Sequence, residues 1–138
     1  MASSFRRFTE KIQEAVASWI DGPVDVVSMM LSMTFFWQSP SLIDALADTI
    51  KTTIKSDGRF IFLTMDGDYV EEVFSSVNEL KLGPATLEYF RDINELHIDI
   101  KDSIVSDQTE WLVHLEDLQK RFRKRWQVGS MDLWMWSL

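Results

Sequence analysis

Two apolar runs, separated by a helical pattern, constrain the fold of this chain more than any other feature. The runs are VDVVSMML at residues 24–31 and RFIFLTM at residues 59–65, and both are largely apolar and β-branched. Runs of this length are typical of strands buried on both faces, as in parallel sheets. We therefore expect two buried parallel strands.

The segment between the two runs has the pattern of a helix. Ser39-Pro40 predicts its start, because serine caps helices and proline is favoured at the first helical position. Ser56-Asp57-Gly58 predicts the turn that follows it. Strand, helix and strand of these lengths predict a βαβ unit. The apolar residues of the helix recur at helical spacing: Leu42, Ile43, Leu46, Ala47, Ile50 and Ile54.

The remaining segments predict further elements around this unit. Residues 4–20 predict an amphipathic helix, because apolar residues recur at helical spacing at Phe5, Phe8, Ile12, Val16 and Trp19. Asp66 is expected to cap another helix, on which the inward-facing residues are Tyr69, Val70, Val73, Phe74 and Val77.

The pattern changes beyond Gly83-Pro84. Residues 95–101 alternate apolar and polar side chains, which predicts an antiparallel strand with one face in water. Residues 110–115 predict a strand that pairs nearby, residues 115–126 predict a helix, and the tail after residue 126 favours a strand. The fold class predicted is α/β, a βαβ unit followed by antiparallel strands.

The composition fits one globular domain over residues 1–138, with 46% hydrophobic residues. The absence of cysteine excludes disulfides and thiolate metal sites, and we assign no metal ligand. No apolar run approaches the roughly 20 residues of a membrane helix. The start, MASSFRRFTEK, lacks the apolar core of a secretory signal. We therefore expect an intracellular protein without membrane contact.

The charge distribution limits nucleic-acid binding to a local site. A net charge of −8 argues against a chain that holds nucleic acid along its whole surface. The segment KRFRKRW at residues 120–126 is strongly basic. It is either a local basic patch or a set of cations that complements the dipole at a helix C-terminus.

The carboxyl ends of the two parallel strands carry SMTFFW (residues 32–37) and TMDGD (residues 64–68). In open α/β sheets, ligands bind outside this edge. TMDGD is therefore either part of a ligand site or a simple helix cap, with Asp66 as the capping residue and Gly67 easing the turn. The two histidines, His97 and His114, are expected on polar faces, and we assign neither a role.

Three segments carry a resemblance to a known family. They are VDVVSMMLSMTFFW, GRFIFLTMDGDYVEEVF and DSIVSDQTEWLVHLEDLQKRF, and together they cover about residues 24–125. In this order and spacing they resemble the C-terminal half of the mRNA cap guanine-N7 methyltransferase domain. The likeness is greatest to the large capping-enzyme subunit of poxviruses and related large DNA viruses.

The resemblance implies a Rossmann-like sheet of which this chain forms the C-terminal half. The family binds S-adenosylmethionine with a glycine-rich loop and an acidic residue in the preceding half. No two glycines of this chain stand in a Gly-x-Gly arrangement. The resemblance therefore implies a partial or split domain, completed by a second chain or an upstream segment that binds the methyl donor.

The resemblance also assigns residues to the site. Glu110 matches the glutamate that reads the cap guanine, and a carboxylate accepts well from the N1–H and N2–H of guanine. Thr34 and Phe35 stand where the family usually has His-Tyr, and Trp37 matches an aromatic position nearby. Met30 stands where a glutamine often supports the methyl donor. No catalytic side chain is expected, because guanine N7 carries no proton and attacks the donor directly.

Two classes of function follow from these observations. In the first, the chain is part of an S-adenosylmethionine-dependent mRNA cap methyltransferase that acts on capped mRNA, in a viral factory or virion. In the second, it is a degenerate, non-catalytic module that binds or stimulates a capping enzyme. The retained TMDGD and Glu110 favour the first, whereas the lost His-Tyr pair and the negative charge favour the second.

Overall fold

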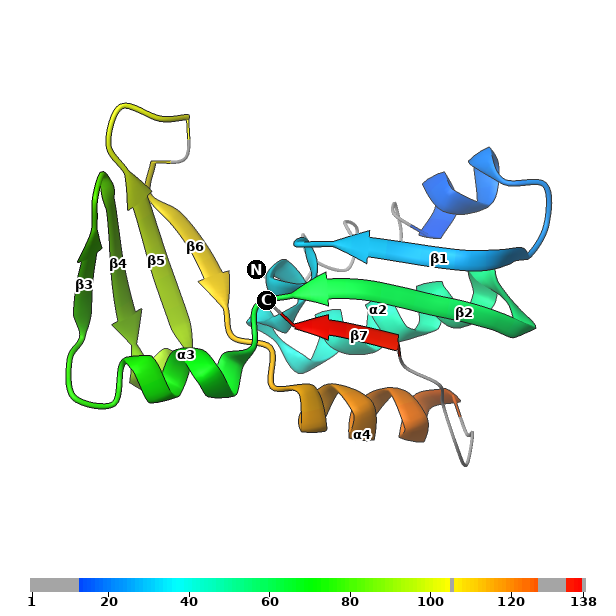
Figure 1. The fold of residues 1–138 in the computed structure, drawn as a ribbon. Helices are drawn as coiled ribbons and strands as arrows, with labels where there is room; N and C mark the ends of the chain where they lie inside the picture. The colour runs from blue at the N-terminus through cyan, green and yellow to red at the C-terminus, as the bar shows by residue number, and fades with distance from the viewer. Residues whose placement is uncertain (1–12, 105, 127–133, 138) are drawn as a thin grey trace.

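The computed structural model describes residues 13–104, 106–126 and 134–137 (Figure 1). A helical segment covers residues 13–19. The named elements follow in the order β1 (Val24–Met30), η1 (Met33–Gln38), α2 (Pro40–Thr53), β2 (Ile54–Thr64), α3 (Gly67–Val73), β3 (Glu79–Leu82), β4 (Ala85–Phe90), η2 (Arg91–Ile93), β5 (Glu95–Ile100), β6 (Gln108–Trp111), α4 (Leu115–Trp126) and β7 (Trp134–Ser137). The α/β class predicted from the sequence is confirmed.

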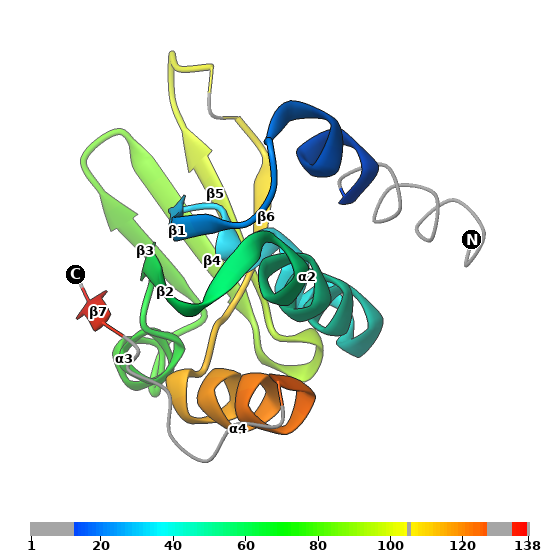
Figure 2. The same cartoon turned by 90° about the vertical axis from the view of Figure 1, so that its right-hand side faces the viewer.

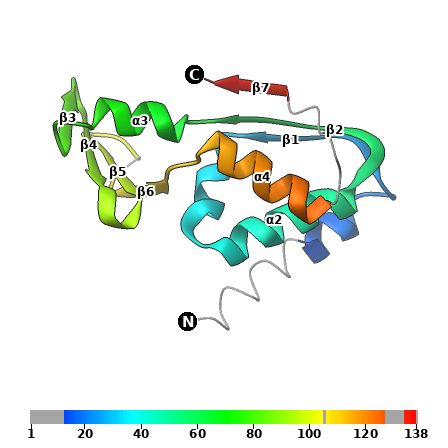
Figure 3. The same cartoon turned by 90° about the horizontal axis from the view of Figure 1, so that it is seen from below.

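The predicted βαβ unit is present as β1, α2 and β2, with the two strands parallel. The Ser39 side chain caps α2 by accepting a hydrogen bond from the Leu42 amide at 3.4 Å, and Pro40 takes the first helical position. β7 adds to the other side of β2, also in parallel, which gives the strand order β1-β2-β7. Figures 2 and 3 show α2 and α4 on the same side of these three strands.

The expectation that β1 is buried on both faces is wrong. Val27 and Met29 pack against the core, whereas Val26 and Met30 on the opposite face are 49% and 55% exposed. The physical reason is that the described helices cover only one face of this sheet. Within the described residues, β1 pairs with β2 alone, so it is an edge strand with one face open.

The turn predicted at Ser56-Asp57-Gly58 lies inside β2. The register steps from Ile54 opposite Val24 to Arg59 opposite Val26, so residues 55–58 form an irregularity in the strand pair rather than a separate turn. The pairing of Ile54 starts β2 directly at the end of α2. Lys55 Nζ lies 2.7 Å from the exposed carboxylate of Asp25 across this irregularity.

A second, antiparallel sheet has the strand order β3-β4-β5-β6. The strand predicted at residues 95–101 is present as β5, and β6 pairs with it. The strand predicted at 110–115 is correct only for residues 110 and 111, because β6 covers Gln108–Trp111 and Leu115 already begins α4. The hairpin of β3 and β4 was not predicted. Gly83, at φ +59°, occupies the left-handed conformation at its turn, ahead of Pro84.

The capping role predicted for Asp66 is confirmed, since its side chain accepts from the amides of Asp68 at 3.0 Å and Tyr69 at 3.5 Å. Of the residues expected to face inward from this helix, Val70 and Phe74 are buried, whereas Tyr69, Val73 and Val77 are exposed. α3 has only 7 residues, and it packs on the second sheet through Val70 and Phe74, which are spaced i, i+4. Its other apolar residues therefore face water.

The main core lies between the three-stranded sheet and the helices α2 and α4. Phe122 of α4 is fully buried and contacts the rings of Phe60 and Trp126, with centroids at 6.0 and 5.3 Å. The helix predicted at residues 115–126 is therefore confirmed.

The two predictions at the chain ends are tested in part. Residues 13–19 of the helix expected over 4–20 are helical, and residues 4–12 lie outside the described residues. Trp19 is 87% exposed, so it does not belong to a buried stripe as expected. The strand favoured in the tail is confirmed for Trp134–Ser137.

Candidate functional site

The carboxyl edge of the three-stranded sheet faces the second sheet. The carboxyl ends of β1, β2 and β7 all point toward the β3–β6 sheet in Figure 1. After β1 the chain bends sharply at Leu31, whose φ is +55° and whose amide donates to the carbonyl of Leu63 at 2.8 Å. The bend leads into η1, which packs against β6. Segments that are far apart in the sequence therefore meet at this edge.

Glu110 of β6 lies partly buried at this meeting point. Burial raises the pKa of its carboxyl above the ordinary value of 4.5, and nearby polar groups of Thr34 and Gln108 oppose the shift. The Gln108 side-chain amide donates to Glu110 Oε1 at 2.9 Å. A partly buried carboxylate without a cationic partner among the described residues is a strong acceptor for an incoming N–H donor.

Thr34 lies beside Glu110, and its side chain opposes the rise in the pKa of that carboxyl. Thr34 is 2% exposed, and its hydroxyl forms no hydrogen bond of standard geometry with any described residue. The hydroxyl of Thr64, at the carboxyl end of β2, is also buried without such a hydrogen bond. Buried hydroxyls without a partner are uncommon, because each one costs about 1–3 kcal/mol.

The other three residues assigned from the sequence differ in how accessible they are. Phe35, next to Thr34 on η1, is 43% exposed and offers part of its ring for stacking. Met30, at the end of β1, is mostly exposed on the open face of the sheet. Trp37 is 8% exposed and packs in the main core, so its ring supports η1 and offers little surface to a ligand.

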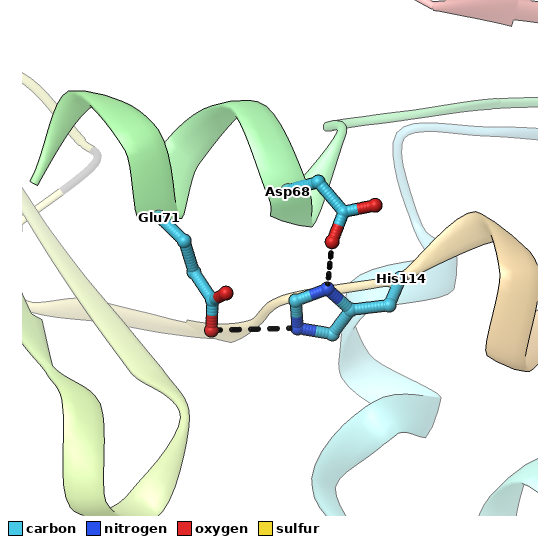
Figure 4. Close-up of side chains that lie close together, drawn as sticks. All are labelled: Asp68, Glu71 and His114. Carbon is cyan, nitrogen blue, oxygen red and sulfur yellow. Dashed lines mark hydrogen bonds and ion pairs between the residues drawn. The ribbon is translucent and has the colours of Figure 1, made fainter. Parts of the chain in front are cut away.

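A second polar cluster, which the sequence did not predict, joins α3 to the segment before α4 (Figure 4). His114 Nδ1 lies 2.7 Å from Asp68 Oδ1, and His114 Nε2 lies 3.7 Å from Glu71 Oε1. Asp68 belongs to TMDGD and stands 46 residues from His114. The i, i+3 spacing of Asp68 and Glu71 was visible in the sequence, but their proximity to His114 depends on the tertiary fold.

The basic segment at residues 120–126 lies on α4 and is partly neutralised. Arg125 donates two hydrogen bonds to the carboxylate of Asp48 on α2, at 2.7 and 2.6 Å, and Arg121 pairs with Asp117 at 2.7 Å. The hydrogen bond from Arg125 lowers the pKa of Asp48. Arg125 therefore links α4 to α2, and Arg121 forms an ion pair on the surface of α4. Both roles favour the interpretation of the segment as helix cations rather than as a basic patch for nucleic acid.

In comparisons with known proteins, no family model and no curated protein sequence matches this chain. None of the described helices is long and apolar enough to cross a membrane. The site combines a carboxylate acceptor, a buried hydroxyl beside it and an exposed aromatic ring at the carboxyl edge of parallel strands.

Proposed function

We propose that this chain is part of an mRNA cap guanine-N7 methyltransferase and that it supplies the surface that reads the cap guanine. The observation that carries the proposal is the placement of Glu110 beside Thr34 at the carboxyl edge of a parallel sheet. Ligands of open α/β folds bind at this edge. The protein is expected inside cells, in a viral factory or virion, with capped mRNA as its substrate.

The architecture supports the Rossmann-like half that the resemblance implies. α2 and α4 cover one face of the parallel sheet (Figure 3), whereas the opposite face carries exposed Val26 and Met30. A doubly wound sheet has helices on both faces and further strands beside its central ones. The open face and the outer edge of β1 are the surfaces that a donor-binding half would cover, from a second chain or an upstream segment.

The chemistry requires binding and orientation rather than proton transfer. The carboxylate of Glu110 accepts from the N1–H and N2–H of guanine, and the exposed ring of Phe35 offers a stacking surface. Guanine N7 is unprotonated, so a base held in place needs no general base. Catalysis would come from proximity and orientation toward the methyl donor.

The methyl donor does not fit a site made by this chain alone. S-adenosylmethionine carries charged and hydrogen-bonding groups, and the one residue assigned to it, Met30, offers only an exposed thioether. The sequence contains no Gly-x-Gly arrangement to approach the donor closely. We therefore assign donor binding to the other half.

Titration with an unmethylated dinucleotide cap analogue, GpppG, tests the proposal, with binding followed by tryptophan fluorescence. Glu110→Gln should weaken binding by about 1–3 kcal/mol, which is about 5-fold to 150-fold. Glu88→Gln on the exposed face of β4 is the matched control, since it removes the same charge from an acidic protein. Asp66→Ala should change affinity only through a loss of local order.

Equal affinity of Glu110→Gln and Glu88→Gln for the analogue would contradict the assignment of Glu110. Loss of affinity in Asp66→Ala but not in Glu110→Gln would mean that the roles of these two residues are reversed.

A non-catalytic, methyltransferase-like subunit is the second candidate function. It is favoured by the open apolar face, since Val26, Met30 and Leu31 are all about half exposed and such patches mark interaction surfaces. The two candidates differ in a complex with the donor-binding half. If the chain is part of the enzyme, Glu110→Gln should lower the affinity of the complex for the cap. If the chain is a stimulatory subunit, the Glu110→Gln variant should raise activity as much as the unsubstituted chain does.

A further inference from the structure

The cluster of Asp68, Glu71 and His114 is not used by the function proposed above. One nitrogen of His114 and one oxygen from each carboxylate can be chosen so that all three atoms lie within 4.8 Å of one another. The carboxylates come from one face of α3, and the imidazole enters from the segment that precedes α4 (Figure 4). Three ligating side chains from two distant parts of the chain therefore converge on one small region.

We propose that Asp68, Glu71 and His114 bind a divalent ion of the zinc type and thereby tie α3 to the segment before α4. Zinc takes imidazole nitrogen and carboxylate oxygen at about 2.0–2.2 Å, with water in a remaining position. Ligand atoms around such an ion lie about 3.3 Å apart, a value that follows from tetrahedral geometry at these bond lengths. The two short contacts use different ring nitrogens, Nδ1 toward Asp68 at 2.7 Å and Nε2 toward Glu71 at 3.7 Å. An ion would bind one of these nitrogens, and the carboxylate on the other side would turn toward it from within the 4.8 Å that separates the chosen ligand atoms.

The approach of the two segments is fixed by backbone contacts outside the cluster. Asp66 and Val113 form a parallel bridge, and the amide of Gly67 donates to the carbonyl of Val113 at 3.0 Å. These contacts stand next to Asp68 in one segment and next to His114 in the other. The ligands are thus presented by a preformed scaffold, and Asp68, whose side chain is 71% exposed, has room to turn toward an ion.

A partner outside the cluster orients one of its ligands. The hydroxyl of Tyr89, a residue buried on β4, donates to Glu71 Oε1 at 3.1 Å. Outer partners of this kind hold a ligating carboxylate in position and are typical of metal sites.

The charge around the cluster also favours a cation. No lysine or arginine among the described residues forms an ion pair with Asp68 or Glu71. Imidazole suits zinc and related transition metals, whereas magnesium and calcium prefer sites made of oxygen ligands. The mixed ligand set therefore selects the zinc class over the alkaline-earth ions.

The experiment uses the full chain without an affinity tag, zinc chloride as the probe and magnesium chloride for comparison. Calorimetry should give one zinc per chain, and zinc should raise the thermal midpoint, because an ion that binds only the folded state stabilises it. His114→Gln and Asp68→Asn should each weaken zinc binding at least tenfold. Magnesium should have no comparable effect at the same concentration.

The matched control is His97→Gln. His97 is the other histidine, and its Nε2 lies 3.1 Å from a single carboxylate, that of Glu95. This variant should bind zinc as the unsubstituted chain does. Circular dichroism identifies a variant that fails to fold, and Asp68→Asn, at an exposed position, provides an independent reading if His114→Gln does so.

Two results would overturn the proposal. One is the absence of zinc binding at millimolar concentration. The other is a loss in His97→Gln as large as in His114→Gln. Neither outcome depends on cap binding, so the metal site and the proposed function can fail separately.

Discussion

Gly67→Ala should destabilise the contact of α3 with the segment between β6 and α4. An added Cβ at Gly67 would lie 2.9 Å from the carbonyl oxygen of Val113 and 3.1 Å from Leu112 Cβ, where ordinary contacts are 3.4–4 Å. Both neighbours belong to the segment between β6 and α4, and one is a backbone atom. The contact must therefore open by about half an ångström, since neither neighbour is the end of a flexible side chain.

The magnitude follows from two opposing effects. Overpacking of a close contact costs about 1–3 kcal/mol, and the hydrogen bond from the Gly67 amide to Val113, now 3.0 Å, would lengthen. Alanine in place of glycine returns up to about 1 kcal/mol through helix propensity. We expect a net loss of about 2 kcal/mol, which for a chain of this size lowers the thermal midpoint by roughly 6–10 °C.

Urea denaturation followed by circular dichroism measures this loss. Gly83→Asn is the control, because Gly83 has open space around it and asparagine tolerates its left-handed conformation. The control should unfold close to the unsubstituted midpoint. A Gly67→Ala variant as stable as the control would refute the close approach of α3 to the β6–α4 connection.

Three further outcomes are expected. Asp66→Ala should cost about 1 kcal/mol in urea denaturation, because it removes the acceptor for two amides at the start of α3, and Asp66→Asn should keep most of that stability. Phe122→Ala should cost about 3–5 kcal/mol in the same assay, since it empties a fully buried position in the main core. Glu110 has a folded-state pKa raised above the ordinary 4.5, so the folded state holds this proton longer than the unfolded chain. Its contribution to the free energy of unfolding therefore falls as pH rises from about 4.5 through the raised pKa, and Glu110→Gln should flatten that fall in a pH series of urea midpoints.

Local signals in the sequence were sufficient for most of the elements. Ser39-Pro40 and Asp66 act through contacts within one turn of the helix that each begins, so their roles follow from neighbouring residues alone. Burial was harder to predict. Val26 and Met30 belong to an apolar run, yet they are half exposed, because burial depends on whether another layer covers that face.

The candidate site residues show the same contrast between local signals and tertiary packing. Glu110 and Thr34 were assigned through the resemblance, and the structure brings them together because η1 packs on β6. Trp37 was assigned with them but belongs to the core, since a tryptophan pattern does not distinguish a packed ring from an exposed one. The proximity of His114 to Asp68 was not predictable, because it arises from the contact of α3 with a segment much later in the chain.

Base discrimination is the most direct test of the claim that Glu110 reads a guanine. The affinities of GpppA, IpppA and ApppA, which differ in one base only, would be compared in the unsubstituted chain and in Glu110→Gln. Inosine lacks the N2 amino group and adenine lacks the N1–H, so each should bind more weakly than guanine, by about 1–3 kcal/mol for adenine. Glu110→Gln should lose most of this preference. A guanine preference that is unchanged in Glu110→Gln would contradict the account.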